Sequence, residues 1–515
     1  MSNSPVGAAP PDQSGDGDMA ALAKGGRTNF FGFLLRLLAR LPWLFIAGRL
    51  YGPAAMGLFA SALVVIELIA MVCSMGEKRG LAQRLTDGEG PEVNLVFDGL
   101  LLALIYSSIA AIFLWFVPAP MFPSGDYSGL DKLIVLAIPA YAMTEILLAA
   151  QAYRYDIATT VRARAVVEPW TVSIMAGVFF YTQFREAGLE LAYVASIYAG
   201  FFTALWSFLR SYGLPQGWRP NPAALMKQTS RAFPLATADA IEWGTRRIDI
   251  FILGLFAAPA AVGVYYAAQQ VASLPQKLKT SFEPILGPVI TKNLKTGNLA
   301  AIAKQVRQVG FWIIAAQAGI ALALGVPGEA VMGLFGPEFV GGTGALAFLL
   351  LAEVVAAMAV VSESALVYTA RKRNLAISIG TIILQAALTI GLIMLVNHLG
   401  FGEPFKAAGA AIALMLALGT ASIVKAWLLS RILKAPVNNW RWALVYATAP
   451  AVVVGYLATL LPEWAELLFG IPAILLTYGY VIWHRGFGPE DRVLFRKNIG
   501  GGSEPEQAQA AQTPN

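Results

Sequence analysis

Two arginines lie inside the first long apolar segment of the chain, Asn29–Leu50. Arg36 and Arg40 are four residues apart, so on a helix they share one face. An ionised group within a bilayer costs about 2.5 to 3.5 kcal/mol, so it is expected to face a cavity or an opposite charge. Guanidinium groups bind phosphate oxygens through paired hydrogen bonds. We favour a phosphate-binding cavity for Arg40; for Arg36, an ion pair with an acid such as Glu67 or Glu145 is equally good.

A second group of charges lies in the apolar segment Phe233–Phe256. Its residues that fall on one stripe of a helix are Asp239, Glu242, Arg246 and Asp249. Glu242 and Arg246 are at the spacing of a helical ion pair, which is at least as good an explanation as substrate contact. Asp239 is the better candidate for an unpaired acid. Together with the first-segment arginines, Asp239, Glu242 and Arg246 are the candidate substrate contacts.

Three further acids lie within apolar segments and are candidates for coupling transport to an ion. They are Glu67, Glu353 and Glu363. Carboxylates at membrane depth carry protons or bind sodium in many coupled transporters, and the sequence does not choose between the two ions. A metal centre is not expected, because the chain has one cysteine and two histidines far apart in sequence. No cofactor is expected either.

The composition requires a membrane. Hydrophobic residues make up 57% of the 515 residues and charged residues 13%, about half of the charged share in soluble domains. By length and hydropathy we count about fourteen membrane-spanning helices, among them Asn29–Leu50, Ala54–Gly76, Val166–Thr182 and Phe233–Phe256. The net charge of +6 is typical of Lys and Arg in cytoplasmic loops, so no nucleic-acid partner is expected.

The distribution of basic residues gives the topology. Lys and Arg gather in every second connection, and one of these predicted cytoplasmic connections holds Arg154, Arg162 and Arg164. This alternation predicts an even number of spans and places both termini in the cytoplasm.

A repeated segment indicates two related halves. The sequence PAAMGLFASA that begins at Pro53 matches PAAVGVYYAA that begins at Pro259, and six predicted spans separate them. An even number of spans gives parallel repeats, with a central pathway between two bundles. The divisions that we expect are a disordered cytoplasmic tail (1–28), an N-terminal six-helix lobe (29–212), a cytoplasmic linker (213–232), a C-terminal six-helix lobe (233–430), two additional helices (431–485) and a disordered cytoplasmic tail (486–515).

Several motifs resemble the polysaccharide transporter branch of the multidrug/oligosaccharidyl-lipid/polysaccharide (MOP) exporter superfamily. They are FP at Phe233, RIDIFILG at Arg247, VGVYYAA at Val262, LFGPEF at Leu334 and GLFA at Gly57. The resemblance implies an all-α polytopic membrane protein with two pseudo-symmetric six-helix lobes, here followed by two C-terminal helices. It also implies alternating access and transport of undecaprenyl-diphosphate-linked sugars across the bacterial inner membrane.

The hypotheses follow from this resemblance. The first is a flippase for lipid-linked oligosaccharide in the biosynthesis of lipopolysaccharide, capsule or exopolysaccharide, with membrane lipids around it and a glycan polymerase and chain-length regulator as candidate partners. The alternatives are an ion-coupled drug or small-solute antiporter and a peptidoglycan-precursor flippase, which the extra helix pair suggests. An enzyme that polymerises or ligates glycans is the weakest alternative, because the sequence has no long extracytoplasmic loop and no recognisable catalytic motif. The oligomeric state is open.

Overall fold

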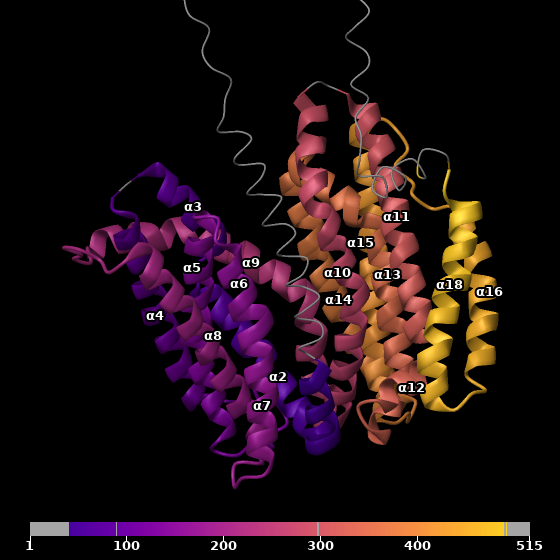
Figure 1. The fold of residues 1–515 in the computed structure, drawn as a ribbon, viewed down its shortest axis with the longest axis horizontal. Helices are drawn as coiled ribbons and strands as arrows, with labels where there is room; N and C mark the ends of the chain where they lie inside the picture. Colours follow the sequence, from indigo (N-terminus) through magenta and orange to yellow (C-terminus); the bar gives the residue numbers. More distant parts are fainter. Residues whose placement is uncertain (1–40, 89, 296–297, 489–490, 492–515) are drawn as a thin grey trace, which may run out of the picture. The chain divides into compact units, whose positions relative to one another are not determined.

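The computed structural model describes residues 41–88, 90–295, 298–488 and 491, and all the regular secondary structure in this part of the chain is helical (Figure 1). This confirms the predicted all-α class. The α-helices are α2 (Gly52–Cys73), α3 (Glu77–Asp87), α4 (Glu92–Phe116), α5 (Ala137–Tyr153), α6 (Ile157–Val161), α7 (Glu168–Phe180), α8 (Gly188–Tyr212), α9 (Pro222–Phe256), α10 (Pro259–Lys295), α11 (Leu299–Gly325), α12 (Gly328–Gly333), α13 (Thr343–Thr369), α14 (Arg371–His398), α15 (Glu403–Leu433), α16 (Ala443–Ala458), α17 (Glu463–Ala465) and α18 (Ile471–Val481). The π-helical segments are Ala47–Tyr51, Arg162–Val167, Glu466–Gly470 and Ile482–Gly486, and the 3-10 segments are Asp131–Leu136 and Pro337–Gly342.

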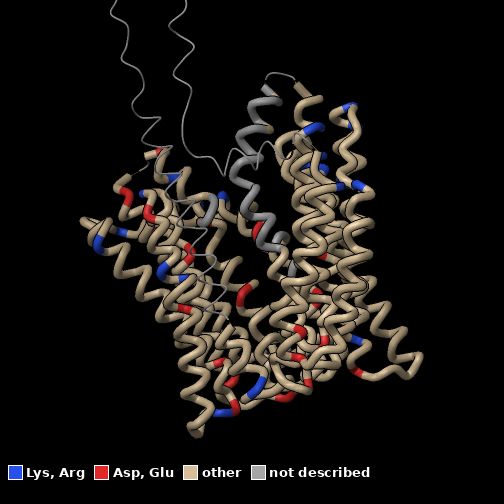
Figure 2. The backbone as a smooth tube through the Cα atoms, turned by 45° about the vertical axis from the view of Figure 1, so that its right-hand side comes forward, with Lys and Arg blue, Asp and Glu red and all other residues tan. Residues whose placement is uncertain are grey.

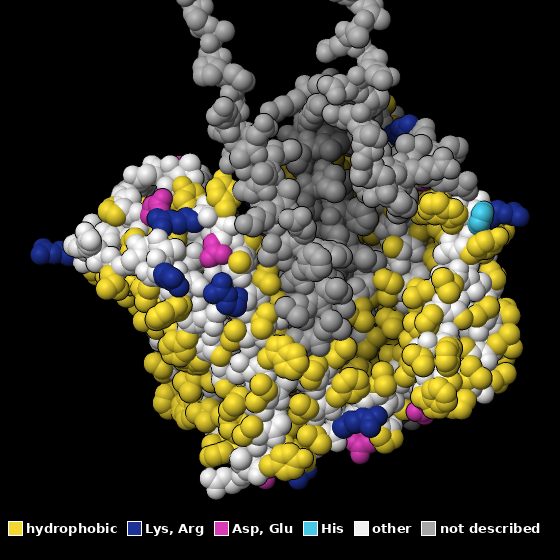
Figure 3. All heavy atoms as spheres, in the orientation of Figure 1, with side chains coloured by type: hydrophobic (Ala, Val, Ile, Leu, Met, Phe, Trp, Pro, Cys, Tyr) yellow, Lys and Arg dark blue, Asp and Glu magenta, His cyan; other side chains and the backbone are white. Residues whose placement is uncertain are grey.

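Ten helical runs among the described residues are long and apolar enough to cross a membrane. Their outer faces carry large hydrophobic side chains, as Figure 3 shows, and on α4 Ile109, Phe113 and Phe116 are 61%, 59% and 77% exposed. Side chains of this size are normally buried in soluble proteins, so these surfaces belong in lipid. The chain is therefore a multi-pass membrane protein, and the predicted number of fourteen spans stays a prediction.

The turn between the first two predicted spans lies at Gly52. Its φ of +83° and ψ of 175° are not helical, so the helical run Leu41–Cys73 is interrupted there. Glycine takes this conformation without the steric cost that a Cβ would add. The interruption agrees with the predicted boundary between Leu50 and Ala54.

Two helices extend beyond the apolar segments found in the sequence. Helix α9 begins at Pro222, before the apolar segment that starts at Phe233, because the Asn221 side chain accepts a hydrogen bond from the N–H of Ala223 (3.0 Å) and Pro222 fits a first turn. The span that contains α7 begins at Ile157 instead of Val166, after Asp156, whose side chain accepts from the N–H of Thr159 (3.1 Å). The predictions followed hydropathy and missed both capping residues.

The chain divides into two compact units. The first is Met1–Ser273 with Val331–Ala352 and Leu375–Ala421, and the second is Leu274–Ala330 with Glu353–Asn374 and Ser422–Asn515. Each has its own apolar core. Residues of the first core include Leu81, Val96, Ile146 and Phe208, and residues of the second include Ile302, Phe311, Val361 and Tyr478. The lobe boundaries expected from the sequence stay a prediction.

The two copies of the repeated segment touch each other at equivalent residues within the first unit. A Cβ on Gly57 of α2 would lie 1.7 Å from the carbonyl oxygen of Pro259, and one on Gly263 of α10 would lie 1.9 Å from that of Pro53. Pro53 and Pro259 occupy the same position of the repeat, as do Gly57 and Gly263, so the contact is reciprocal. Only glycine permits backbones to come this close.

In the second unit, Asp491 connects the C-terminal helices to α11. Its carboxylate accepts hydrogen bonds from Arg441 Nη1 (3.0 Å), Gln308 Nε2 (3.1 Å), Trp312 Nε1 (2.9 Å) and the N–H of Gly488 (2.8 Å). Burial alone would raise the pKa of this carboxyl, but these hydrogen bonds outweigh it and hold the pKa below its ordinary value.

Candidate functional site

The side chains predicted to contact substrate fall mostly outside the part that the structure describes. Arg36 and Arg40 lie outside it altogether, and for Glu242 and Arg246 only the backbone, in α9, is described. Asp239 is placed: it lies on α9 and is 6% exposed. The assignment of these five residues to a substrate site therefore stays a prediction.

The best-defined polar site within the membrane-spanning helices centres on Arg164. In Figure 2 most Lys and Arg positions lie toward the ends of helices, whereas Arg164 lies within the helical run Ile157–Phe180. Its guanidinium donates to both carboxylate oxygens of Glu168 (2.9 and 3.1 Å) and to Glu145 of α5. It also lies over the ring of Tyr141, 4.6 Å from the centroid. The four side chains form one charge-bridged group at membrane depth.

This group bears on two expectations from the sequence. Arg164, expected in a cytoplasmic connection, is helical: it lies in a π-helical segment, Arg162–Val167, within the helical run Ile157–Phe180. Glu145 is bonded to Arg164, and its pairing with the first-span arginines, which lie outside the described residues, stays a prediction. The spacing of Arg164 and Glu168, four residues apart, was the signal that could have revealed an intramembrane pair.

A second polar network lies beside the first and connects α9 with α10. The Arg247 guanidinium donates to Gln269 Oε1 (3.2 Å), and Gln269 Nε2 donates to Asp249 Oδ2 (3.3 Å). The same carboxylate oxygen accepts the hydroxyl hydrogen of Tyr265. Asp249 is fully buried, and its Oδ1 has no hydrogen-bond partner among the described residues. Arg247 and Asp249 are the residues that carry the RID motif found in the sequence.

Glu67 of α2 links the two networks electrostatically, because its charge acts on both Arg247 and Tyr141. The acids of the combined group are Glu67, Glu145, Glu168 and Asp249, and its bases are Arg164 and Arg247. Among the side chains that the structure describes, four acids and two bases give this group an excess of two negative charges when all are ionised, which is an arrangement that attracts a proton or a cation.

The other two predicted coupling residues belong to the second unit. Glu363 of α13 accepts an ion pair from Lys425 Nζ of α15 at 3.0 Å, and Ser422 of α15 donates to the carbonyl of Val355 at 3.0 Å. Glu353 is half-buried on α13. The charge of Glu363 is therefore already paired with that of Lys425. The sequence had suggested that Glu363 is available to a transported ion.

Comparison with known proteins places these helices in a recognised group. Residues 46–309, just over half of the chain, match a family model described as polysaccharide biosynthesis protein. No curated protein sequence matches the chain. Among solved structures, the lipid II flippase MurJ in an inward closed conformation is similar with a TM-score of 0.67 and 12% identity, over 93% of this chain and 100% of that one.

Two further structures share the fold. An inward-facing multidrug resistance MATE family transporter of the MOP superfamily has a TM-score of 0.64 and 17% identity, over 78% of this chain and 95% of that one. A MOP superfamily transporter from Pyrococcus furiosus has a TM-score of 0.53 and 17% identity, over 80% of this chain and 95% of that one. The alignment with MurJ leaves out fewer residues of this chain than the segment 443–486 contains. It must therefore include part of the C-terminal helices.

Proposed function

Because this chain belongs to the polysaccharide biosynthesis protein family and shares the fold of MOP superfamily transporters, we propose that it is a flippase for undecaprenyl-diphosphate-linked oligosaccharide. The observation that carries the proposal is the family match, since residues 46–309 include both networks of the candidate site. The proposed location is the bacterial inner membrane, with both termini in the cytoplasm. The glycan would enter lipopolysaccharide, capsule or exopolysaccharide.

Fixed guanidinium groups are the chemistry that a diphosphate headgroup needs. They offer paired hydrogen bonds to phosphate oxygens and keep their charge at any physiological pH. In the proposal Arg36 and Arg40 contact the diphosphate, with Asp239, Glu242 and Arg246 lining the same pathway. The prenyl chain remains in lipid, where its burial costs nothing.

Coupling to an ion is part of the proposal. The excess negative charge around Glu67 supports protonation or cation binding at this group, which would change how α2, α5 and α9 hold together. Glu353 and Glu363 are the corresponding residues of the second unit. For Glu363 the ion would have to compete with Lys425.

The proposal is tested in proteoliposomes with a fluorescent polyprenyl-diphosphate saccharide, by following its passage between leaflets. Arg40→Ala should abolish translocation while membrane insertion stays normal. The control is Gly177→Ala on α7, since a Cβ at this position meets no atom within 4 Å. Translocation by Arg40→Ala at the normal rate would remove Arg40 from the proposed site.

Two alternative functions are supported by similarity to particular solved structures. The MATE fold supports an ion-coupled antiporter of drugs or small solutes, and uptake of an organic cation against its gradient would establish it. The MurJ likeness, which reaches into the C-terminal helices, supports a flippase for a peptidoglycan precursor. Translocation of a polyprenyl-diphosphate muropeptide in preference to an oligosaccharide would show that function.

A further inference from the structure

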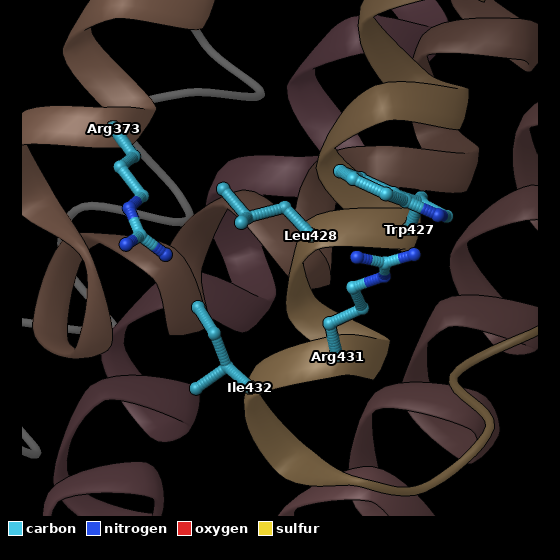
Figure 4. Close-up of a pocket in the computed structure, with 5 residues that line it drawn as sticks. All are labelled: Arg373, Trp427, Leu428, Arg431 and Ile432. Carbon is cyan, nitrogen blue, oxygen red and sulfur yellow. The ribbon is translucent and has the colours of Figure 1, made fainter.

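A basic pocket lies between α14 and α15 in the second unit, whereas both polar networks belong to the first. Its lining residues are Arg373 from the first turn of α14 and Trp427, Leu428, Arg431 and Ile432 from the last turns of α15, and its volume is about 410 Å³. Figure 4 shows the two guanidinium groups on either side of Leu428 and Ile432, with that of Arg431 next to the Trp427 ring. Nothing in the proposed transport pathway uses this pocket.

The arginines of this pocket differ from the four arginines that form ion pairs in the described part of the chain. Those four, each bonded to a carboxylate, are Arg84, Arg154, Arg164 and Arg441. Neither Arg373 nor Arg431 has an ion-pair partner in the described part of the chain, and no acid lines the pocket. Arg431 instead stacks on Trp427, 4.3 Å from the ring centroid. Stacking fixes the plane of the guanidinium and leaves its hydrogen-bond donors for an external anion.

The other half of the pocket is apolar. Trp427 is 53% exposed, and Leu428 and Ile432 lie beside it. Indole side chains of this kind prefer the membrane–water interface, where headgroups meet acyl chains. The topology predicted from loop charges places this end of α14 and α15 at the cytoplasmic leaflet, where anionic lipids attract basic residues.

We propose that the pocket binds the phosphate headgroup of a resident anionic glycerophospholipid of the cytoplasmic leaflet. The guanidinium groups of Arg373 and Arg431 hold the phosphate, and Trp427, Leu428 and Ile432 contact the first carbons of the chains. The bound lipid fills the space between the ends of α14 and α15 and stabilises the second unit. This role does not depend on which substrate the protein transports.

A simpler explanation is that these arginines only fix topology, as basic residues in cytoplasmic loops do. In that case Arg371 and Lys434 should contribute as much as the pocket arginines do. Both are exposed and positively charged, and they lie two to three residues from Arg373 and Arg431 without lining the pocket. The double variants R373Q/R431Q and R371Q/K434Q remove the same charge and distinguish the two explanations. R373K/R431K keeps the charge and removes the paired hydrogen bonds.

The test uses the full chain in detergent, with bound lipid counted by native mass spectrometry and stability followed by thermal unfolding. Phosphatidylglycerol should remain bound to the wild type and R371Q/K434Q, and its retention should fall roughly tenfold or more in R373Q/R431Q, with R373K/R431K between them. Phosphatidylcholine should stabilise all four proteins equally. Equal retention by the two glutamine variants would overturn the proposal.

Two further probes identify the source of the phosphate. If undecaprenyl diphosphate displaces phosphatidylglycerol at equal concentration, the pocket belongs to the transported substrate and the resident-lipid proposal fails. If inorganic phosphate alone gives the same stabilisation as phosphatidylglycerol, the pocket is an anion site without lipid specificity, which also overturns it. Stabilisation by phosphatidylglycerol alone supports the proposal.

Discussion

Alanine at position 57 would place a methyl group inside the crossing of α2 and α10. The added Cβ would lie 1.7 Å from the carbonyl oxygen of Pro259, whereas ordinary contacts begin at 3.4 Å. The neighbouring atom belongs to the backbone, so no side-chain rotation relieves the clash. The two helices must therefore separate by about the difference between these distances at this point.

The energetic consequence can be estimated from two opposing effects. Replacing glycine by alanine inside a helix normally stabilises it by up to about 1 kcal/mol. Overpacking costs about 1 to 3 kcal/mol, and more where the backbone must move. The net loss is thus on the order of 1 to 2 kcal/mol, which shifts an equilibrium between a closed and a separated crossing by roughly tenfold. Gly263→Ala should cause a similar loss of stability. The double variant should lose less stability than the two single variants together, because the helix separation caused by the first alanine relieves the clash of the second.

Thiol labelling measures this separation directly. Cys73 is the only cysteine, so Cys73→Ala gives a cysteine-free background in which Met56→Cys reports on the crossing. Met56 is fully buried beside Gly57, and its cysteine should react about tenfold faster in the Gly57→Ala protein. Gly177→Ala, which meets no neighbouring atom, is the control and should leave the rate unchanged. Unchanged labelling in Gly57→Ala, with a raised melting temperature, would refute the reasoning.

Two other predictions concern ion pairs. Because hydrogen bonds lower the pKa of Asp491 in the folded protein, its contribution to stability is present above the unfolded value of about 3.9 and is lost as the pH falls through the folded value. Thermal unfolding should therefore show Asp491→Asn less stable at neutral pH, with the difference from the wild type shrinking below pH 4; a constant difference would contradict this. Arg164→Gln removes the cation that bridges Glu145 and Glu168 and should destabilise the protein by about 3 kcal/mol, with partial recovery when Glu145→Gln is added. A melting temperature equal to the wild type would show that the pair is not structural.

The features that the sequence predicted well are those carried by local composition. Long apolar runs identify a membrane protein without tertiary information, because each span must satisfy its own backbone in lipid. The turn at Gly52 and the match between the Pro53 and Pro259 segments were also visible. The repeat did not by itself show that Gly57 and Gly263 touch, since contact depends on how the two segments fold together.

The candidate site was only partly accessible to sequence reasoning. Counting basic residues places Arg164 in a cytoplasmic loop, because the sequence does not show that Arg162–Val167 is a π-helical segment within a longer helical run. Its bond to Glu145 joins separate helices, which no spacing rule detects. The network of Asp249 with Tyr265 and Gln269 likewise links two helices, although the sequence analysis had singled out Asp249 and Tyr265 within motifs.

The reciprocal contact of Gly57 and Gly263 has a consequence for how the two halves vary. It is an isologous contact, in which each partner offers the same surface, and a two-fold homodimer of a single half would make the same one. In a single chain, however, the two glycines are separate positions that can mutate one at a time. A larger residue at either position is accommodated only by movement of the other copy, so the two segments are constrained as a pair.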